Sequence, residues 1–138
     1  MFSTAKDVVN MAALVATNIL ENRFKQVHVD EVRGLVESNA YILDVREVGE
    51  FANGHIKNAV NIPLSELRER MNEIPKDRTI YVHCRSAQRS YNAVMALLHN
   101  GYENVYNVSG SFLGICLYEY FNDVTKKREP IVTQYNFK

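Results

Sequence analysis

The sequence predicts an α/β domain with a mostly parallel, five-stranded sheet that is flanked by helices and preceded by an extra N-terminal helix. Two observations predict this class. Short apolar segments of strand length alternate with amphipathic segments of helix length along the chain. The 138 residues also suffice for one domain with a sizeable core. The alternation favours parallel strands, because each helix returns the chain to the edge of the sheet where the next strand begins.

The N-terminal part begins with an amphipathic helix over residues 4–22. Its apolar residues recur at the spacing of one helix face: Val8, Met11, Ala12, Val15 and Ile19. A short strand over 26–29 follows, and Asp30 is a suitable N-cap for a helix over 31–38, because its carboxylate can accept unpaired first-turn N–H groups. The nearly continuous apolar run at 41–45 is typical of a strand buried on both faces.

Short elements are expected in the middle of the chain. Residues 47–54 predict a short helix that ends at Gly54, because glycine readily adopts the conformation that closes helices. A strand over 59–64 follows. Ser65 is then in position to cap a helix over residues 66–74.

The alternation continues in the second half. Residues 79–83 predict a fourth strand, and the amphipathic segment that ends at Gly101 predicts a helix from about residue 90. A fifth strand is expected over 104–108, followed by an apolar helix over 112–121. The remaining C-terminal residues show no clear period.

The composition argues against several classes of protein. Acidic and basic residues number 16 each, so no excess of positive charge indicates nucleic acid or a membrane surface as a partner. The apolar stretch VVNMAALVATNIL is too short to cross a bilayer, and no basic segment precedes it as in a secretory signal. The two cysteines, Cys84 and Cys116, form neither a disulfide framework nor a zinc motif. We therefore expect a cytoplasmic chain without a metal site.

Cys84 directly follows the strand predicted at 79–83, and Arg85 and Arg89 lie one and five positions beyond it. The loop CRSAQR turns the chain from a strand into a helix, so its backbone N–H groups can converge into a concave site that attracts anions. These dipoles and both arginines favour the thiolate form of Cys84, which is the nucleophilic form. The arginines can also hold an anionic substrate through charge-assisted hydrogen bonds.

Competing interpretations exist for these residues. Cys84 can be an inert core residue, and Arg85 and Arg89 can be solvated surface charges. Cys116 keeps the core interpretation, because its neighbours are apolar and carry no positive charge: Leu113, Ile115 and Leu117.

Three ordered segments, which together cover residues 41–112, resemble the rhodanese-like sulfurtransferases: YILDVREVGEFANGHIKNAVNIPL, YVHCRSAQRS and NGYENVYNVSGSF. The resemblance implies that Cys84 is the catalytic nucleophile. It would take a sulfane sulfur from a donor, become a persulfide and pass the sulfur to a nucleophilic acceptor. The resemblance also implies a substrate-binding loop made of Arg85, Ser86, Ala87, Gln88 and Arg89.

The resemblance also implies roles for four residues of the first segment. Asp44 and Arg46 end a neighbouring strand, where they are expected to bind the substrate or to brace the loop. A local strand-end ion pair is the alternative for them. Gly54 is expected as a helix stop, and His55 as a hydrogen-bonding anchor.

The loop departs from related families at two points. Many rhodanese-like proteins have glycine where this chain has Ala87, and alanine would cost about 1 kcal/mol there if the backbone is left-handed. Cysteine phosphatases place five residues between cysteine and arginine, whereas four separate Cys84 from Arg89. Phosphatase or arsenate reductase activity is therefore disfavoured. A non-catalytic docking or sulfur-sensing module is the second hypothesis.

The N-terminal segments STAKDVVNMAALVATNIL and QVHVDEV resemble the junction in flavin-dependent CoA-disulfide reductases, which belong to the pyridine nucleotide-disulfide oxidoreductases and carry a C-terminal rhodanese domain. Val8 stands where proline is expected. This resemblance implies a helix or linker at 1–24 from a preceding oxidoreductase part, a rhodanese-like domain at 25–122 and a tail at 123–138.

The same resemblance implies partners. FAD and NAD(P)H would belong to the missing flavoprotein part, and no glycine-rich dinucleotide fingerprint occurs in this chain. The sulfur donor would be thiosulfate, polysulfide or a persulfide, and the acceptor a thiol such as CoA. A flavoprotein oxidoreductase domain is an expected partner. The apolar face of the first helix favours a homodimer.

Overall fold

Five strands form one sheet in the computed structural model, which describes residues 25–136. The strands are β1 (Gln26–Val27), β2 (Tyr41–Asp44), β3 (Val60–Asn61), β4 (Ile80–His83) and β5 (Val105–Val108). Their order across the sheet is β1-β5-β4-β2-β3, and every neighbouring pair is parallel. The predicted α/β class with a five-stranded sheet is confirmed. The helix predicted over 4–22 lies outside the described residues.

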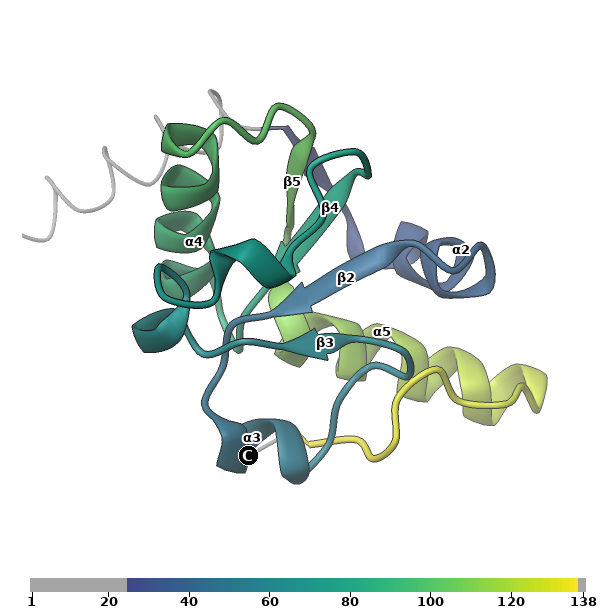
Figure 1. Cartoon of the computed structure of the whole chain (residues 1–138). Coiled ribbons are helices and arrows are strands. Elements are labelled where there is room, and N and C mark those ends of the chain that lie inside the picture. Colours follow the sequence, from purple (N-terminus) through teal and green to yellow (C-terminus); the bar gives the residue numbers. More distant parts are fainter. Residues whose placement is uncertain (1–24, 137–138) are drawn as a thin grey trace, which may run out of the picture.

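Residues 25–136 contain four α-helices, and three of them cover the two faces of the sheet (Figure 1). The four are α2 (Val32–Glu37), α3 (Val48–Ala52), α4 (Gln88–His99) and α5 (Ser111–Lys126). Short 3-10 turns supplement them: η1 (Val29–Glu31), η2 (Leu64–Glu66) and η3 (Met71–Glu73). Helix α4 packs on one face, whereas α2 and α5 pack on the other (Figure 1).

A separate apolar core lies on each face of the sheet. Neighbouring residues of β2 show how one strand serves both, since Leu43 belongs to the core under α4 and Ile42 to the core under α2 and α5. Both side chains are buried. The continuous apolar run at 41–45 therefore indicated correctly a strand covered on both sides.

The helix predicted over residues 66–74 is not present. The chain forms the turns η2 and η3 instead, and Pro63 rather than Ser65 precedes the first of them. The apolar residues of the segment still reach the core: Leu67, Met71 and Ile74. Their spacing fits a helix face, but successive tight turns bury the same side chains.

The predicted cap at Asp30 is also wrong. Asp30 lies inside η1, and α2 begins only at Val32. The neighbouring Glu31 accepts the hydrogen bond from the His28 N–H at 2.8 Å instead. This carboxylate closes the 3-10 turn η1, whereas no side chain among the described residues caps α2.

Helix α5 continues to Lys126, five residues beyond its predicted end, so the boundary expected after residue 122 falls inside it. Arg33 of α2 and Arg128 each contact the carboxylates of Glu119 and Asp123 at 2.7–3.2 Å. These ion pairs join the residue Arg128, which follows α5, to α5 and α2, because the two buried carboxylates lie between both arginines.

The C-terminal segment packs against the domain. Ile131 and Val132 are buried, and Val132 pairs with Ile56 in an isolated antiparallel bridge.

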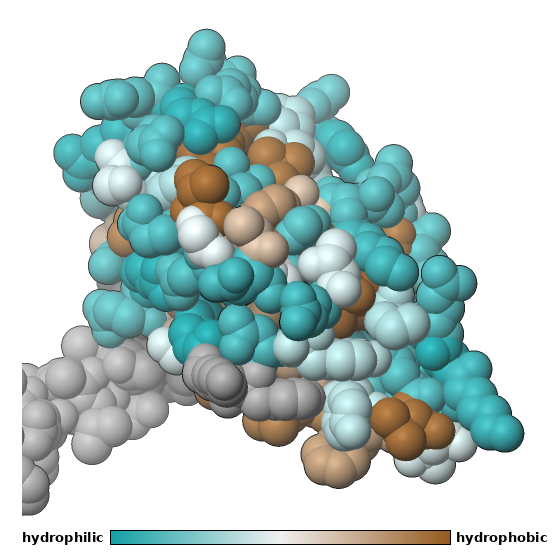
Figure 2. All heavy atoms as spheres, turned by 90° about the horizontal axis from the view of Figure 1, so that it is seen from below, coloured by the Kyte–Doolittle hydropathy of each residue, from teal (hydrophilic) through white to brown (hydrophobic). Residues whose placement is uncertain are grey.

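The face of the molecule that is seen from below in Figure 2 is mostly hydrophilic, with scattered hydrophobic residues. Within the described residues 25–136, no helix is long and apolar enough to span a membrane.

Candidate active site

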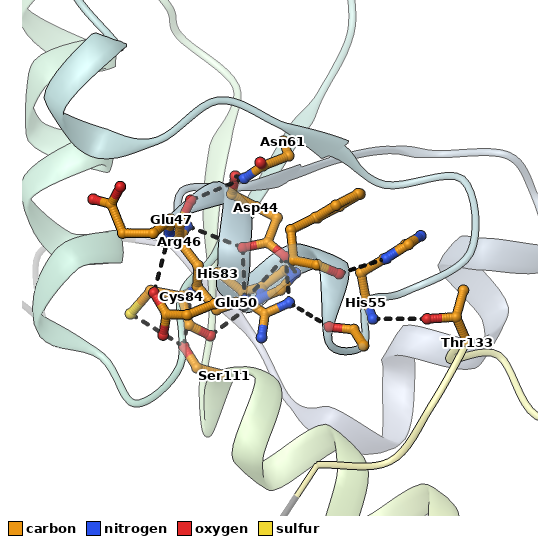
Figure 3. A network of polar contacts seen from close by, with 12 residues as sticks. Asp44, Arg46, Glu47, Glu50, His55, Asn61, His83, Cys84, Ser111 and Thr133 are labelled. Atoms are coloured by element: carbon orange, nitrogen blue, oxygen red, sulfur yellow. Dashed lines mark hydrogen bonds and ion pairs between the residues drawn. The ribbon is translucent and has the colours of Figure 1, made fainter.

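Cys84 lies at the carboxyl end of β4, where the sequence placed it. Its N–H donates to the Ser111 hydroxyl oxygen at 3.3 Å, and its carbonyl accepts from the Phe112 N–H at 2.9 Å. The Arg85 carbonyl accepts from the Leu113 N–H at 3.2 Å. First-turn N–H groups of a helix have no partner within it, so these bonds cap α5 with the backbone of the loop. The loop is thereby fixed to α5 (Figure 3).

The same loop runs directly into α4. The helix begins at Gln88, two residues before Ser90, so Gln88 and Arg89 of the predicted substrate-binding loop belong to its first turn. The Ser90 hydroxyl donates to the carbonyl of Ala87 at 2.7 Å. Ser86 and Gln88 are exposed, and Arg85 is half-buried. Helix α4 thus begins at this loop, the first turn of α5 is bonded to it, and both N-termini favour negative charge.

Ala87 carries no backbone strain of the kind that glycine would relieve. Its φ is 178°, an extended value that any residue adopts. The expected cost of alanine in place of glycine is therefore absent at this position.

Arg89 is paired with Glu50 of α3. Its Nη1 donates to Oε1 at 2.6 Å, and its Nη2 donates to Oε2 at 3.0 Å. Hydrogen bonds from Arg89 are the main reason why the pKa of Glu50 falls from 4.5 to about 2. Glu50 also accepts from the Glu47 N–H at 3.0 Å, which closes the first turn of α3. The sequence prediction did not select Glu50, although a glutamate three residues after the N-cap residue of a helix is a capping signal.

Asp44 and Arg46 form a buried ion pair. Arg46 Nε lies 2.9 Å from Asp44 Oδ1, and Nη2 lies 2.7 Å from Oδ2. The same Nη2 donates to the Gly54 carbonyl at 2.8 Å, and the guanidinium lies 4.0 Å from the centroid of the Phe112 ring. Both side chains are 0% exposed. They therefore brace the ends of β2 and α3, as in the strand-end alternative, and present no surface to a donor (Figure 3).

Gly54 and His55 take the supporting roles expected of them. Gly54 follows α3 with a φ of 150°, and a Cβ there would lie 2.5 Å from the Gln134 carbonyl oxygen. The ring of His55 stacks on Phe51, with the centroids 3.8 Å apart, and Nδ1 donates to the Phe51 carbonyl at 2.8 Å. The His55 N–H donates to Thr133 Oγ1 at 3.0 Å. These contacts join α3 to the C-terminal segment.

His83 is a buried neighbour of Cys84 that sequence reasoning did not select. Its Nδ1 lies 3.1 Å from the Cys84 carbonyl oxygen, which can only accept, so Nδ1 carries the proton. Burial lowers the pKa of His83, although Asp44 favours its charged form. A neutral imidazole therefore supports the Cys84 backbone from below the loop. Its Nε2 lies 3.7 Å from Asp44 Oδ2.

Cys116 behaves as the sequence suggested. It lies on α5 in the core beneath α2, is 0% exposed, and burial raises the pKa of its thiol. Cys84 is also buried, at 1% exposure, but it lies at the loop rather than within a helix. Across residues 25–136, no group of histidine, cysteine and acidic side chains is arranged to hold a metal ion.

Several hollows on the described surface lie away from Cys84. Three of them, with volumes of about 300–410 Å³, extend along η2, η3 and one side of α4. Their linings include Arg68 and Asn100, but not Cys84 or Arg89. The candidate active site is therefore identified by its chemistry and backbone geometry.

Sequence relatives cover most of this arrangement. The model of the family "Rhodanese-like domain" matches residues 28–117. A protein from Allochromatium vinosum named sulfurtransferase is 40% identical over 72 residues, which are 52% of this chain and 67% of that protein. A tRNA uridine(34) hydroxylase from Hamiltonella defensa is 29% identical over 131 residues, which cover 86% of this chain and 36% of that protein.

Two solved structures share the fold. Reduced CoADR-RHD from Bacillus anthracis matches with a TM-score of 0.66 and 42% sequence identity. The matched part is 75% of this chain and 18% of the CoADR-RHD chain. An NAD-dependent persulfide reductase from A. fulgidus matches with a TM-score of 0.58 and 36% sequence identity. The matched part is 72% of this chain and 17% of the reductase chain. The chain thus spans less than a fifth of either protein. The family model matches residues 28–117, and the fold is shared with the rhodanese-containing CoADR-RHD structure. This chain therefore belongs to the rhodanese-like domain family.

Proposed function

We propose that this chain is a sulfurtransferase in which Cys84 accepts a sulfane sulfur atom and carries it as a persulfide. The position of Cys84 is the observation that carries the proposal. The residue directly follows β4, its backbone is bonded to the first turn of α5, and its loop leads into the start of α4. Two helix N-termini therefore converge near one thiol, and their dipoles favour negative charge beside it.

The transfer balances without an external oxidant or reductant. The Cys84 thiolate attacks the outer sulfur of a donor R–S–SH, and a bond forms between Sγ and that sulfur. The S–S bond of the donor breaks, and its electron pair leaves with R–S⁻. An acceptor thiolate then attacks the outer sulfur of the Cys84 persulfide, takes it up and restores the Cys84 thiolate. With thiosulfate as the donor, the leaving group is sulfite.

The loop residues have separate roles in this proposal. Arg85 and Arg89 supply positive charge beside the loop, and the exposed Ser86 and Gln88 are available to contact the donor. Ala87 ends the loop as the N-cap of α4. Asp44 and Arg46 act from below, by fixing the strand end.

The donor, the acceptor and the wider system are proposals as well. We infer a thiosulfate-, polysulfide- or persulfide-type donor and a thiol acceptor such as CoA, because the structural neighbours include CoADR-RHD and a persulfide reductase. A flavoprotein oxidoreductase that holds FAD and NAD(P)H would then be a partner of this chain. A cytoplasmic location and a homodimer formed through residues 4–22 stay predictions.

Intact-mass measurement tests the function. Incubation with polysulfide or thiosulfate should add the mass of one sulfur atom to the folded protein, and peptide mapping should place it on Cys84. Cys84→Ser should take up none, whereas Cys116→Ser should load normally. Sulfur found only on Cys116 would contradict the assignment. A folded protein that takes up no sulfur from either donor would favour the alternative of a non-catalytic docking or sulfur-sensing module.

A further inference from the structure

The loop that follows Cys84 is less cationic than its sequence indicates. Two arginines belong to it, Arg85 and Arg89, but Glu47 and Glu50 lie at the start of α3 beside it (Figure 3). Glu50 bonds directly to Arg89, and the charges of Glu50, Cys84 and Glu47 all act on the Arg89 guanidinium. The formal charges of the two arginines and two glutamates cancel.

Glu50 is held in place from two sides. Its carboxylate accepts from both terminal nitrogens of Arg89 and from the Glu47 N–H. A substrate anion that approaches Arg89 therefore meets a guanidinium whose two terminal nitrogens already donate to a carboxylate. To bind there it must displace Glu50 or lie beside its negative charge. The side chains of Glu50 and Arg89 are 30% and 32% exposed, so solvent screens this charge only in part.

We propose that Glu50 determines donor specificity, by disfavouring dianionic donors such as thiosulfate relative to persulfides that carry a single negative charge. The inference rests on the proposed sulfur transfer and narrows its substrate class. A donor with one more negative charge than another interacts more unfavourably with Glu50, whereas both interact alike with the neutral parts of the loop. The expected donor is thus a persulfide of a small thiol.

Glu50→Gln is the appropriate variant, because glutamine keeps the length and an acceptor for Arg89 and for the Glu47 N–H but removes the charge. The measurement is the second-order rate constant for loading Cys84 with sulfur, followed by mass spectrometry in a single turnover. The two probes are thiosulfate, a dianion, and the persulfide of 2-mercaptoethanol, a monoanion. The preference is the ratio of the two rate constants.

The wild-type protein should load faster from the persulfide than from thiosulfate. Glu50→Gln should shift the ratio toward thiosulfate by about fivefold to tenfold, and added salt should reduce this shift. A purely structural effect would slow both donors together and leave the ratio and its salt dependence unchanged. Glu73→Gln is the matched control, because it also removes a carboxylate from a bidentate arginine pair, with Arg70 in the η3 region.

The outcomes separate the two proposals. If Cys84 loads from both probes but the ratio is the same in Glu50→Gln and wild type, the specificity inference is overturned and the sulfurtransferase function stands. An equal shift in Glu73→Gln would also overturn it, since a remote charge would then suffice. If folded wild-type protein loads from neither probe, both proposals are wrong.

Discussion

The Ser111 hydroxyl accepts a hydrogen bond from the Cys84 N–H and lies 3.9 Å from the Cys84 sulfur. Ser111 is fully buried, and its φ of 50° lies in the left-handed region, directly after Gly110 with a φ of 89°. A non-glycine residue costs about 1–2 kcal/mol in that conformation. The strained residue thus places its only polar side-chain atom beside the candidate nucleophile, which is the pattern expected of a positioning residue.

Two substitutions at Ser111 separate strain from hydrogen bonding. Ser111→Ala keeps the strained Cβ and leaves the buried Cys84 N–H without its acceptor, which should cost about 1–3 kcal/mol of unfolding free energy. Ser111→Gly loses the same acceptor but relieves the strain, so it should be about 1 kcal/mol more stable than Ser111→Ala. Urea unfolding checks the order wild type, glycine, alanine. Equal stabilities for all three would show that the hydroxyl and the strain do not matter.

Arg89 is expected to order the loop rather than only to supply charge. Arg89→Lys keeps the charge but loses the planar fork that binds both oxygens of Glu50. Both Arg89→Lys and Arg89→Ala should therefore lower the rate of sulfur transfer by about tenfold to a hundredfold. Transfer rates and thermal melts of both variants test this. Near-normal activity in a folded Arg89→Ala protein would reduce Arg89 to a surface charge, and a mild effect of lysine alone would favour a purely electrostatic role.

The Glu50 carboxylate should make the stability depend on acid pH. Its pKa is about 2 in the folded chain and 4.5 without these contacts, mainly because Arg89 donates hydrogen bonds to the ionised form. The unfolded chain therefore binds a proton first, so the contribution is present above pH 4.5 and is lost as the pH falls toward 2. The free energy of unfolding of Glu50→Gln should fall less steeply than that of wild type across this range. Identical slopes would contradict the shifted pKa.

The Asp44–Arg46 pair should matter for stability more than an exposed pair. Burial opposes ionisation of Asp44, but the hydrogen bonds and the positive charge of Arg46 favour the ionised carboxylate, so the pKa of Asp44 is lowered and both partners are charged. Asp44→Asn leaves the buried Arg46 guanidinium without a counter-charge and should cost about 3–5 kcal/mol. Glu73→Gln, at the exposed Arg70 pair, should leave the unfolding midpoint nearly unchanged. A small effect of Asp44→Asn in urea unfolding would indicate that solvent reaches the pair.

The sequence by itself determined the class of fold and the place of the nucleophile. Apolar segments of strand length fixed the five strands, because burial of a parallel sheet on both faces requires them. The position of Cys84 directly after β4 followed from the same pattern. The local pattern predicted a helix over 66–74, where the chain forms the turns η2 and η3 instead. A helix and a series of turns can bury the same apolar side chains, so the pattern does not distinguish them.

Only the tertiary structure decided what surrounds Cys84. Glu50 is 39 residues from Arg89 along the chain, and Ser111 is 27 residues from Cys84, so no local spacing indicates either contact. The fold places α3 close enough to the start of α4 for Glu50 and Arg89 to pair, and it places the first turn of α5 against Cys84. The sequence shows two arginines beside a cysteine, whereas the fold brings a carboxylate to one of them. Charges far apart in sequence can compensate only after the elements that carry them have packed.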